Sequence, residues 1–140
     1  MKLIIPTIQD IAAEVTKFLP LLKEAKIVLL YGEMGMGKTT FTQEVLRQMG
    51  ISQLEGSPTY SLVNEYESEK YGKIYHLDLY RLNSEEEAYD IGIEEILDGE
   101  NYCFIEWPEK IESFLDLHFL EIRFSLNETL EREILITKKS

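Results

Sequence analysis

The residues of this sequence best suited to chemistry form a glycine-rich run at positions 32–40. It reads Gly-Glu-Met-Gly-Met-Gly-Lys-Thr-Thr, which matches the phosphate-binding pattern of glycine, four residues, glycine, lysine and a hydroxyl residue. Gly35 and Gly37 allow backbone N–H groups to curl around phosphates. Lys38 adds a full positive charge between the β and γ phosphates, and the Thr39 hydroxyl is a ligand for Mg²⁺. The run predicts a nucleotide phosphate site.

The flanking residues predict the elements that must hold this loop. Positions 27–31 are an unbroken apolar run, as in a strand covered on both faces. After the loop, Phe41, Val45 and Met49 recur at four-residue spacing and Gly50 follows as a C-terminal cap, as in a helix. Strand, loop and helix in this order aim the helix N-terminus at the phosphates. This context disfavours the alternative that a glycine-rich turn carries the motif by chance.

A second acid is needed to hold the magnesium ion, and two candidates follow apolar strand patterns. Glu106 follows the apolar run 102–105, so it emerges where ligands bind in open α/β sheets. Asp78 lies within the alternating run 74–80, where an aspartate is costly unless it is paired or near a cation. We assign Glu106 to the metal and Asp78 to the attacking water. Two alternatives stay open: exchanged roles, and an Asp78 that only pairs with Arg81.

The rest of the chain predicts alternating helices and strands in one domain, 1–140, without repeats or linkers. A strand at 2–5 precedes a helix from Thr7 to about position 20. Alternating residues from 60 to 66 and from 74 to 80 predict a hairpin that turns near 68–72. Short helices follow at 84–92, 93–97 and 108–115, with a strand at 102–105 between them. A closing hairpin pairs 119–126 with 133–137.

Composition excludes several classes of protein. The net charge of −12 leaves no basic surface for the phosphate backbone, so we expect no direct, nonspecific binding of nucleic acid. Cys103 is the only cysteine, which excludes an internal disulfide and a multi-cysteine metal site. No apolar run approaches the ~18 residues of a membrane span, and the first residues lack a secretory signal. We expect a cytoplasmic protein.

Four motifs occur in an order that is more specific than a generic phosphate loop. They are the run 32–40, Ser57-Pro58-Thr59-Tyr60, the run His-Leu-Asp-Leu-Tyr-Arg-Leu at 76–82, and Glu-Trp-Pro-Glu at 106–109. Together they resemble the TsaE (formerly YjeE) family of small bacterial ATPases required for threonylcarbamoyl-adenosine modification of tRNA. The resemblance extends over nearly the whole chain, from about Thr7 to Ile136.

This resemblance implies a fold, a reaction and a partner. The implied fold is an α/β, three-layer P-loop NTPase-type sandwich with a mixed sheet and β-hairpins. The implied activity is hydrolysis of ATP to ADP with Mg²⁺, in support of a TsaB–TsaD heterodimer that modifies tRNA. At the N-terminal helix, Ile11 or Asp10 replaces a threonine usual in the family, which leaves the adenine contacts there open.

The resemblance also implies roles for individual residues. Thr39 and Glu106 hold the metal, Asp78 is catalytic, and Thr59 lies in a switch-like loop that faces the γ-phosphate. The residues implied to bind the nucleotide are Glu33, Met34, Gly35, Met36, Gly37, Lys38, Thr39, Thr40, Trp107 and Arg132.

Two other functions share the phosphate-loop signature. A small P-loop kinase is the main alternative enzyme, although the chain shows no obvious lid and no arginine-rich clamp. A nucleotide-dependent adaptor that does not hydrolyse ATP is the other. Eight carboxylates and no basic residue lie between Ser84 and Glu100. This acidic segment is either a solvated helix face or a surface that attracts a basic partner.

Overall fold

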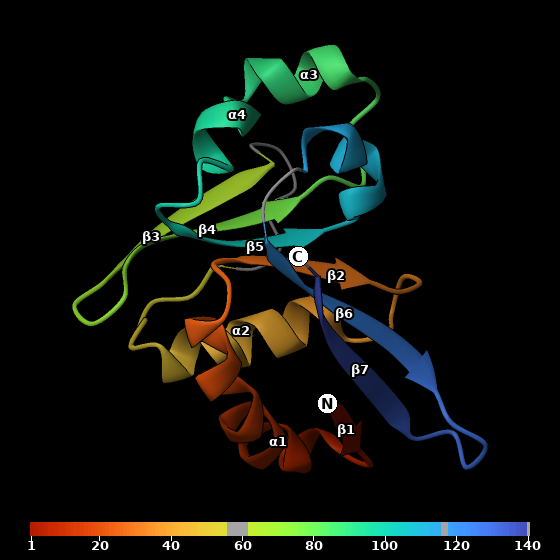
Figure 1. Ribbon diagram of the computed structural model, residues 1–140. Helices are drawn as coiled ribbons and strands as arrows, with labels where there is room; N and C mark the ends of the chain where they lie inside the picture. Colours follow the sequence, from red (N-terminus) through yellow and green to blue (C-terminus); the bar gives the residue numbers. More distant parts are fainter. Residues whose placement is uncertain (56–61, 116–117, 140) are drawn as a thin grey trace.

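The computed structural model describes residues 1–55, 62–115 and 118–139, and within them the chain builds a mixed seven-stranded sheet (Figure 1). The strand order is β1-β7-β6-β2-β5-β4-β3. β6, β2, β5 and β4 are mutually parallel, whereas β1, β7 and β3 run antiparallel to their neighbours. The strands are β1 (Lys2–Ile5), β2 (Ile27–Tyr31), β3 (Val63–Ser68), β4 (Gly72–Asp78), β5 (Tyr102–Glu106), β6 (Phe119–Leu126) and β7 (Arg132–Lys139).

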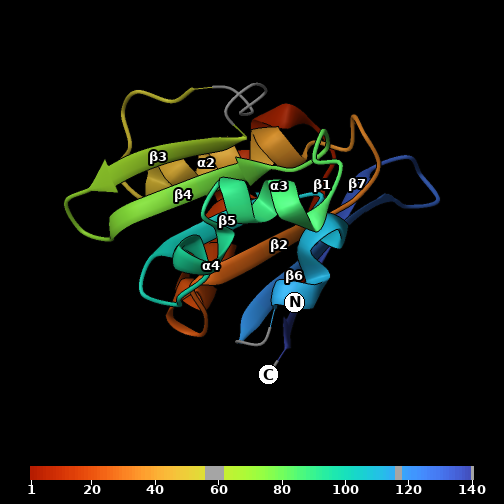
Figure 2. The ribbon, with the colours of Figure 1, turned by 90° about the horizontal axis from the view of Figure 1, so that it is seen from above.

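Helices cover both faces of the sheet, which confirms the predicted three-layer α/β fold (Figures 1 and 2). In Figure 1, α1 and α2 lie below the sheet, and α3 and α4 lie above it. The helical segments are η1 (Ile8–Asp10), α1 (Ile11–Phe18), η2 (Leu19–Lys23), α2 (Lys38–Gln48), α3 (Glu85–Asp90), α4 (Ile93–Ile96) and η3 (Pro108–Phe114), where η denotes a 3-10 helix.

The apolar run of β2 explains why the sheet is covered twice. Val28 and Leu30 belong to the core beneath α1 and α2, whereas Ile27 and Leu29 belong to the core beneath α3 and α4. All four side chains are almost fully buried. Because side chains alternate along a strand, only an unbroken apolar run satisfies both layers at once. Cys103 of the neighbouring β5 is buried in the second core, and this burial raises the pKa of its thiol.

Most predicted boundaries agree with the structure, and the exceptions have local causes. The N-terminal helix ends at Phe18 and continues as η2, with Pro20 in its first turn. The segment after Pro108 is a 3-10 helix with a kink at Ile111, not an α-helix. β4 ends at Asp78 and does not reach Tyr80, because the Tyr80 N–H turns back to donate to Asp78 Oδ1. Within the described part of the chain, no helix is long and apolar enough to cross a membrane.

Candidate functional site: a phosphate loop with a buried carboxylate

The phosphate loop connects the C-terminal end of β2 to the first residue of α2. Gly35 and Gly37 have φ values of 84° and 96°, a left-handed conformation that side chains other than glycine adopt at a cost. Gly37 is the N-cap of α2, and Lys38 is the first helical residue. The free N–H groups of the loop and helix therefore converge on one place, together with the positive end of the helix dipole.

Lys38 is held at the floor of this loop. The residue is 5% exposed, and Nζ donates a hydrogen bond of 2.6 Å to the carbonyl oxygen of Gly32. Nζ also lies 3.7 Å from the centroid of the Trp107 ring, a cation–π distance. Burial lowers the pKa of Lys38, and the negative charges of Glu106, Glu109 and Asp78 oppose this shift. The partners of the Lys38 ammonium group are thus a neutral carbonyl oxygen and an aromatic ring. A phosphate would bind this cation more strongly than either of them.

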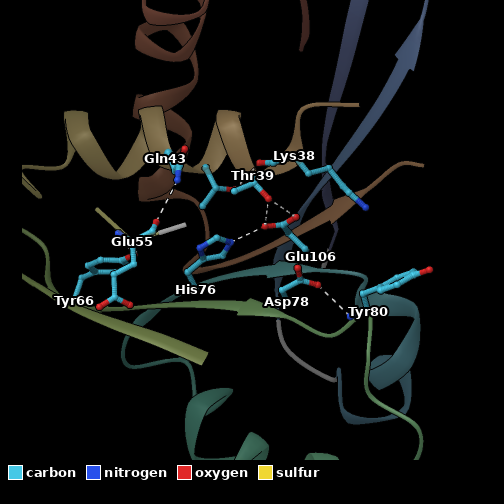
Figure 3. Close-up of polar contacts among 10 residues, drawn as sticks. Lys38, Thr39, Gln43, Glu55, Tyr66, His76, Asp78, Tyr80 and Glu106 are labelled. Atoms are coloured by element: carbon cyan, nitrogen blue, oxygen red, sulfur yellow. Dashed lines mark hydrogen bonds and ion pairs between the residues drawn. The ribbon is translucent and has the colours of Figure 1, made fainter. Parts of the chain in front are cut away.

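The buried carboxylate of Glu106 lies directly beside the first turn of α2 (Figure 3). Thr39 Oγ1 lies 2.9 Å from both Oε1 and Oε2 of Glu106, and His76 Nε2 lies 2.7 Å from Oε2. Glu106 is 3% exposed. A buried carboxylate must be paired or hydrogen-bonded, and here it has two polar neighbours and a lysine nearby.

Asp78 lies next to Glu106 on the adjacent strand. The register of β4 and β5 pairs these two residues, so both predicted acids reach the same edge of the sheet. Asp78 Oδ1 accepts a 3.0 Å hydrogen bond from the Tyr80 N–H, and its side chain lines the cavity described below. Arg81 lines the same cavity, and the catalytic role of Asp78 stays a prediction.

Trp107 covers the loop from the end of β5. Its backbone is left-handed, with φ 59°, and Pro108 follows as the first residue of η3. This sharp change of direction places the indole ring over Lys38 and 5.0 Å from the ring centroid of Tyr80. Trp107 thus lines the cavity, and its place beside a bound nucleotide stays a prediction.

Arg132 reaches the loop from the other side, at the start of β7. Its Nε donates a 3.1 Å hydrogen bond to the carbonyl oxygen of Met36, 96 residues away in the chain. The guanidinium packs so closely on Gly37 that an added Cβ would lie 3.3 Å from Nε. Arg132 of the tail hairpin therefore lines the same cavity as the loop, and its contact with a nucleotide stays a prediction.

These elements line a large, open cavity of about 630 Å³. Its volume lies within the range of small-molecule sites. The structure thus assembles most of the predicted residues around one space. It adds Tyr80 and Arg81, which belong to the motif at 76–82 but were not predicted as site residues. Its lining residues are Met34, Gly35, Gly37, Lys38, Thr39, Thr40, Asp78, Tyr80, Arg81, Glu106, Trp107 and Arg132.

Two predicted phosphate ligands, Glu33 and Met36, belong to the loop but not to the cavity lining. The Met36 N–H donates to the Glu33 carbonyl oxygen at 3.3 Å, so their backbone shapes the turn. Met36 instead lines a small apolar cavity of about 50 Å³ beside Arg132.

Thr59 lies outside the described residues, so its catalytic role stays a prediction. The chain that leads toward it is held at Glu55 (Figure 3). The Gln43 side chain of α2 donates to the Glu55 carbonyl oxygen at 3.2 Å, and the Glu55 N–H donates to the Tyr66 hydroxyl at 3.2 Å. Gln43 is one helical turn beyond Thr39, so this anchor lies on the same helix as the phosphate loop.

The oxygen ligands available at this site suit Mg²⁺, which needs only one or two protein ligands. They do not suit a metal ion whose ligands are all protein side chains. Among the described residues, no group of three or more His, Cys, Asp or Glu side chains is placed to hold an ion. One hydroxyl and one carboxylate do converge, at Thr39 and Glu106. Mg²⁺ is usually bound through one or two such ligands together with waters and substrate phosphates.

Comparison with known proteins agrees with this geometry. The family model described as "Threonylcarbamoyl adenosine biosynthesis protein TsaE" matches residues 5–134. The tRNA threonylcarbamoyladenosine biosynthesis protein TsaE of Rickettsia bellii is 40% identical over 123 residues, which cover 87% of this chain and 84% of that protein. The protein of the same name from Treponema pallidum is 34% identical over 136 residues, or 97% and 99% of the two chains.

A solved structure shows the same architecture. The crystal structure of Bacillus subtilis YdiB superposes with a TM-score of 0.72 at 26% identity, over 99% of this chain and 84% of that one. The family match spans every element of the site except the far part of β7. The chain therefore belongs to the TsaE family, P-loop proteins of threonylcarbamoyladenosine biosynthesis in tRNA.

Proposed function

We propose that this chain binds ATP with Mg²⁺ and hydrolyses it to ADP and phosphate in support of tRNA threonylcarbamoyladenosine modification. The observation that carries the proposal is the contact of Thr39, in the first turn behind the phosphate loop, with the buried carboxylate of Glu106. A hydroxyl and a carboxylate at this place are the protein ligands that a nucleotide-bound magnesium ion requires.

Each residue of the cavity takes one task in this reaction. The N–H groups of the loop hold the β-phosphate, and Lys38 leaves the Gly32 carbonyl oxygen and the Trp107 ring to neutralise the β and γ phosphates. Thr39 and Glu106 hold the magnesium ion. When bound, this ion supplies positive charge that stabilises the transferring phosphoryl group.

Asp78 is the residue best placed to act on water. It lines the cavity, and the sheet register places it opposite Glu106. In the proposed step, the water oxygen bonds to the γ-phosphorus, the bond to the bridging oxygen breaks, and that oxygen leaves on ADP. The proton of the water passes toward Asp78. Thr59 is proposed to face the same phosphate.

The nucleotide base is proposed to follow the loop past Thr40 toward Arg132. Arg132 lines both the large cavity and the small apolar cavity, which also contains Ile8 and Ile11. Ile8 is 59% exposed, so an apolar surface is available next to a planar cation. A planar, partly apolar base suits such a surface.

The partner is proposed to be the TsaB–TsaD heterodimer, in the cytoplasm. Two features of the chain support a reaction that a partner completes. The cavity is open to solvent at Tyr80 and Arg81, both exposed, and a water-accessible γ-phosphate is poorly stabilised. The net charge of −12 also disfavours direct stable binding of tRNA, which supports the proposal that the partner contacts the tRNA.

Phosphate release tests this proposal. Purified protein with ATP and Mg²⁺ is expected to release phosphate slowly alone and faster with TsaB–TsaD, and the release is expected to stop when Mg²⁺ is chelated. A small P-loop kinase would instead transfer phosphate to an added acceptor without releasing it. A nucleotide-dependent adaptor would bind ATP and the partner without turnover. Either result would replace the proposed activity.

A further inference from the structure

We infer that His76 is a positioning residue for the metal site, which holds the Glu106 carboxylate toward Thr39. The inference rests on the proposed function, because it assigns this residue a role toward the magnesium ion of the same cavity. His76 does not line the cavity. It acts through Glu106 alone.

The sheet places the His76 side chain next to the Glu106 carboxylate. The register of β4 and β5 sets His76 opposite Phe104, and Asp78 opposite Glu106. Ile74, two residues before His76, and Phe104 both belong to the core beneath α1 and α2, so His76 and Glu106 face the same layer as α2. His76 is thus the diagonal neighbour of Glu106, and its Nε2 lies 2.7 Å from Oε2 (Figure 3).

The hydrogen bond has a definite direction. An ionised carboxylate only accepts, so Nε2 carries the hydrogen and donates to Glu106. Thr39 Oγ1 approaches both carboxylate oxygens from α2, at 2.9 Å each. The carboxylate is therefore held from the sheet side by an imidazole and faces the hydroxyl that the metal requires.

The other ring nitrogen argues against a purely structural histidine. His76 is fully buried, and its Nδ1 has no hydrogen-bond partner among the described residues. Buried polar atoms are normally paired, and an unpaired one costs free energy. An apolar side chain would fill this place without that cost. What the imidazole contributes is therefore the bond to Glu106.

Holding the carboxylate matters because a glutamate side chain has several rotatable bonds. An unheld Glu106 would lose conformational freedom when metal binds, and that loss would weaken binding. Hydrogen-bond partners of metal-binding side chains usually change metal affinity or activity by about 10–100-fold when they are removed. His76 has the position and the donor for this role.

Three variants separate positioning from packing. His76→Gln can deliver an amide N–H near the place of Nε2, because its chain is of similar reach. His76→Asn is also polar, but its amide reaches only as far as Nδ1. His76→Leu fills the space without a donor. The Asn variant keeps the test decisive if the protein does not tolerate Leu.

The measurement is ADP affinity by calorimetry, in saturating Mg²⁺ and again in EDTA, with melting temperatures recorded alongside. The parent protein is expected to bind ADP more tightly with Mg²⁺. His76→Leu and His76→Asn should lose about tenfold or more of this gain and keep the affinity in EDTA. His76→Gln should keep most of the gain.

The outcomes distinguish this inference from the proposed function. A parent protein whose ADP affinity does not depend on Mg²⁺ overturns the proposed metal site, and with it the role of His76. If the Leu and Asn variants keep the full gain in ADP affinity that Mg²⁺ gives the parent protein, the role of His76 is overturned and the proposed metal site is not. Equal losses with Mg²⁺ and with EDTA in all three variants also overturn it, because they indicate a disturbed core.

Discussion

Lys38 and Trp107 hold each other across the phosphate loop: the ammonium nitrogen lies 3.7 Å from the centroid of the indole ring. The two residues come from opposite sides of the site, since Lys38 begins α2 and Trp107 follows β5. In this arrangement the lysine has an aromatic ring and the carbonyl oxygen of Gly32 as its partners. A phosphate is a stronger partner than either, so nucleotide binding should separate the pair.

The first prediction concerns the emission of Trp107. Adding ADP with Mg²⁺ should change the fluorescence of the protein, because the charge over the indole ring moves to the phosphates. Trp107 is the only tryptophan in the sequence, so the signal has one source. The Lys38→Met variant at the same nucleotide occupancy should lack most of this change. An identical change in that variant would show that the lysine does not move.

The second prediction concerns Lys38 itself. Lys38→Ala should abolish hydrolysis and weaken nucleotide binding by about 2 kcal/mol or more, roughly 30-fold, because the phosphates lose the charged side chain of the loop. The free energy of unfolding should change little, since the contacts of Lys38 are offset by the burial of its charge. Calorimetry and denaturant titration measure both. Lys70→Ala is the control, because Lys70 is exposed and lies outside the cavity. Unchanged turnover in the Lys38→Ala variant would refute the role of Lys38 in hydrolysis.

The third prediction separates the two acids. Glu106→Gln should raise the Mg²⁺ concentration needed for half-maximal turnover by at least about tenfold, because a metal ligand is weakened. Asp78→Asn should lower turnover on the order of 100-fold and keep nucleotide binding, because it removes the group that acts on water. Turnover measured against Mg²⁺ concentration distinguishes them. If both variants keep the magnesium dependence of the parent protein, the assignment of roles fails.

The fourth prediction compares two glycines with similar backbone conformations. Gly37 in the loop has φ 96°, and Gly50 after α2 has φ 99°. Replacement by alanine at either place should destabilise the protein by about 1 kcal/mol or more through backbone strain. Only Gly37→Ala should also reduce nucleotide affinity, because its Cβ would crowd Arg132. Equal nucleotide affinity in the two variants would contradict the packing of Arg132 on the loop.

The fifth prediction rests on the proposed partner. Glu86, Glu94 and Glu95 are exposed on α3 and α4, and replacing all three with Gln should weaken binding to TsaB–TsaD at low salt. The difference should shrink at high salt, and the basal turnover should stay unchanged. Glu87 is left intact because it accepts a hydrogen bond from the Asn83 N–H and belongs to the helix cap. Unchanged affinity at low salt would leave this acidic surface with a solvating role only.

Local patterns in the sequence were sufficient for the loop and the elements on either side of it. The apolar run of β2, the glycines of the loop and the four-residue spacing in α2 are each short-range features, and the structure confirms the elements that they predict. The capping pair of Thr7 and Asp10 is also present. Such features depend on the local backbone conformation and on which face of a helix or strand is apolar. Residues a few positions apart in the chain determine both of these properties.

The contacts that complete the site depended on the tertiary structure. The alternation in β4 placed His76 and Asp78 on one face, but only the position of β4 beside β5 brought them to Glu106. Arg132 reached Met36 because the tail hairpin packs beside β2 through β6. Strand order and register arise from the free energy of the whole core, which pairs residues far apart in the chain. The sequence by itself therefore determined the phosphate loop, and the packing of the sheet decided which carboxylate, imidazole and guanidinium groups surround it.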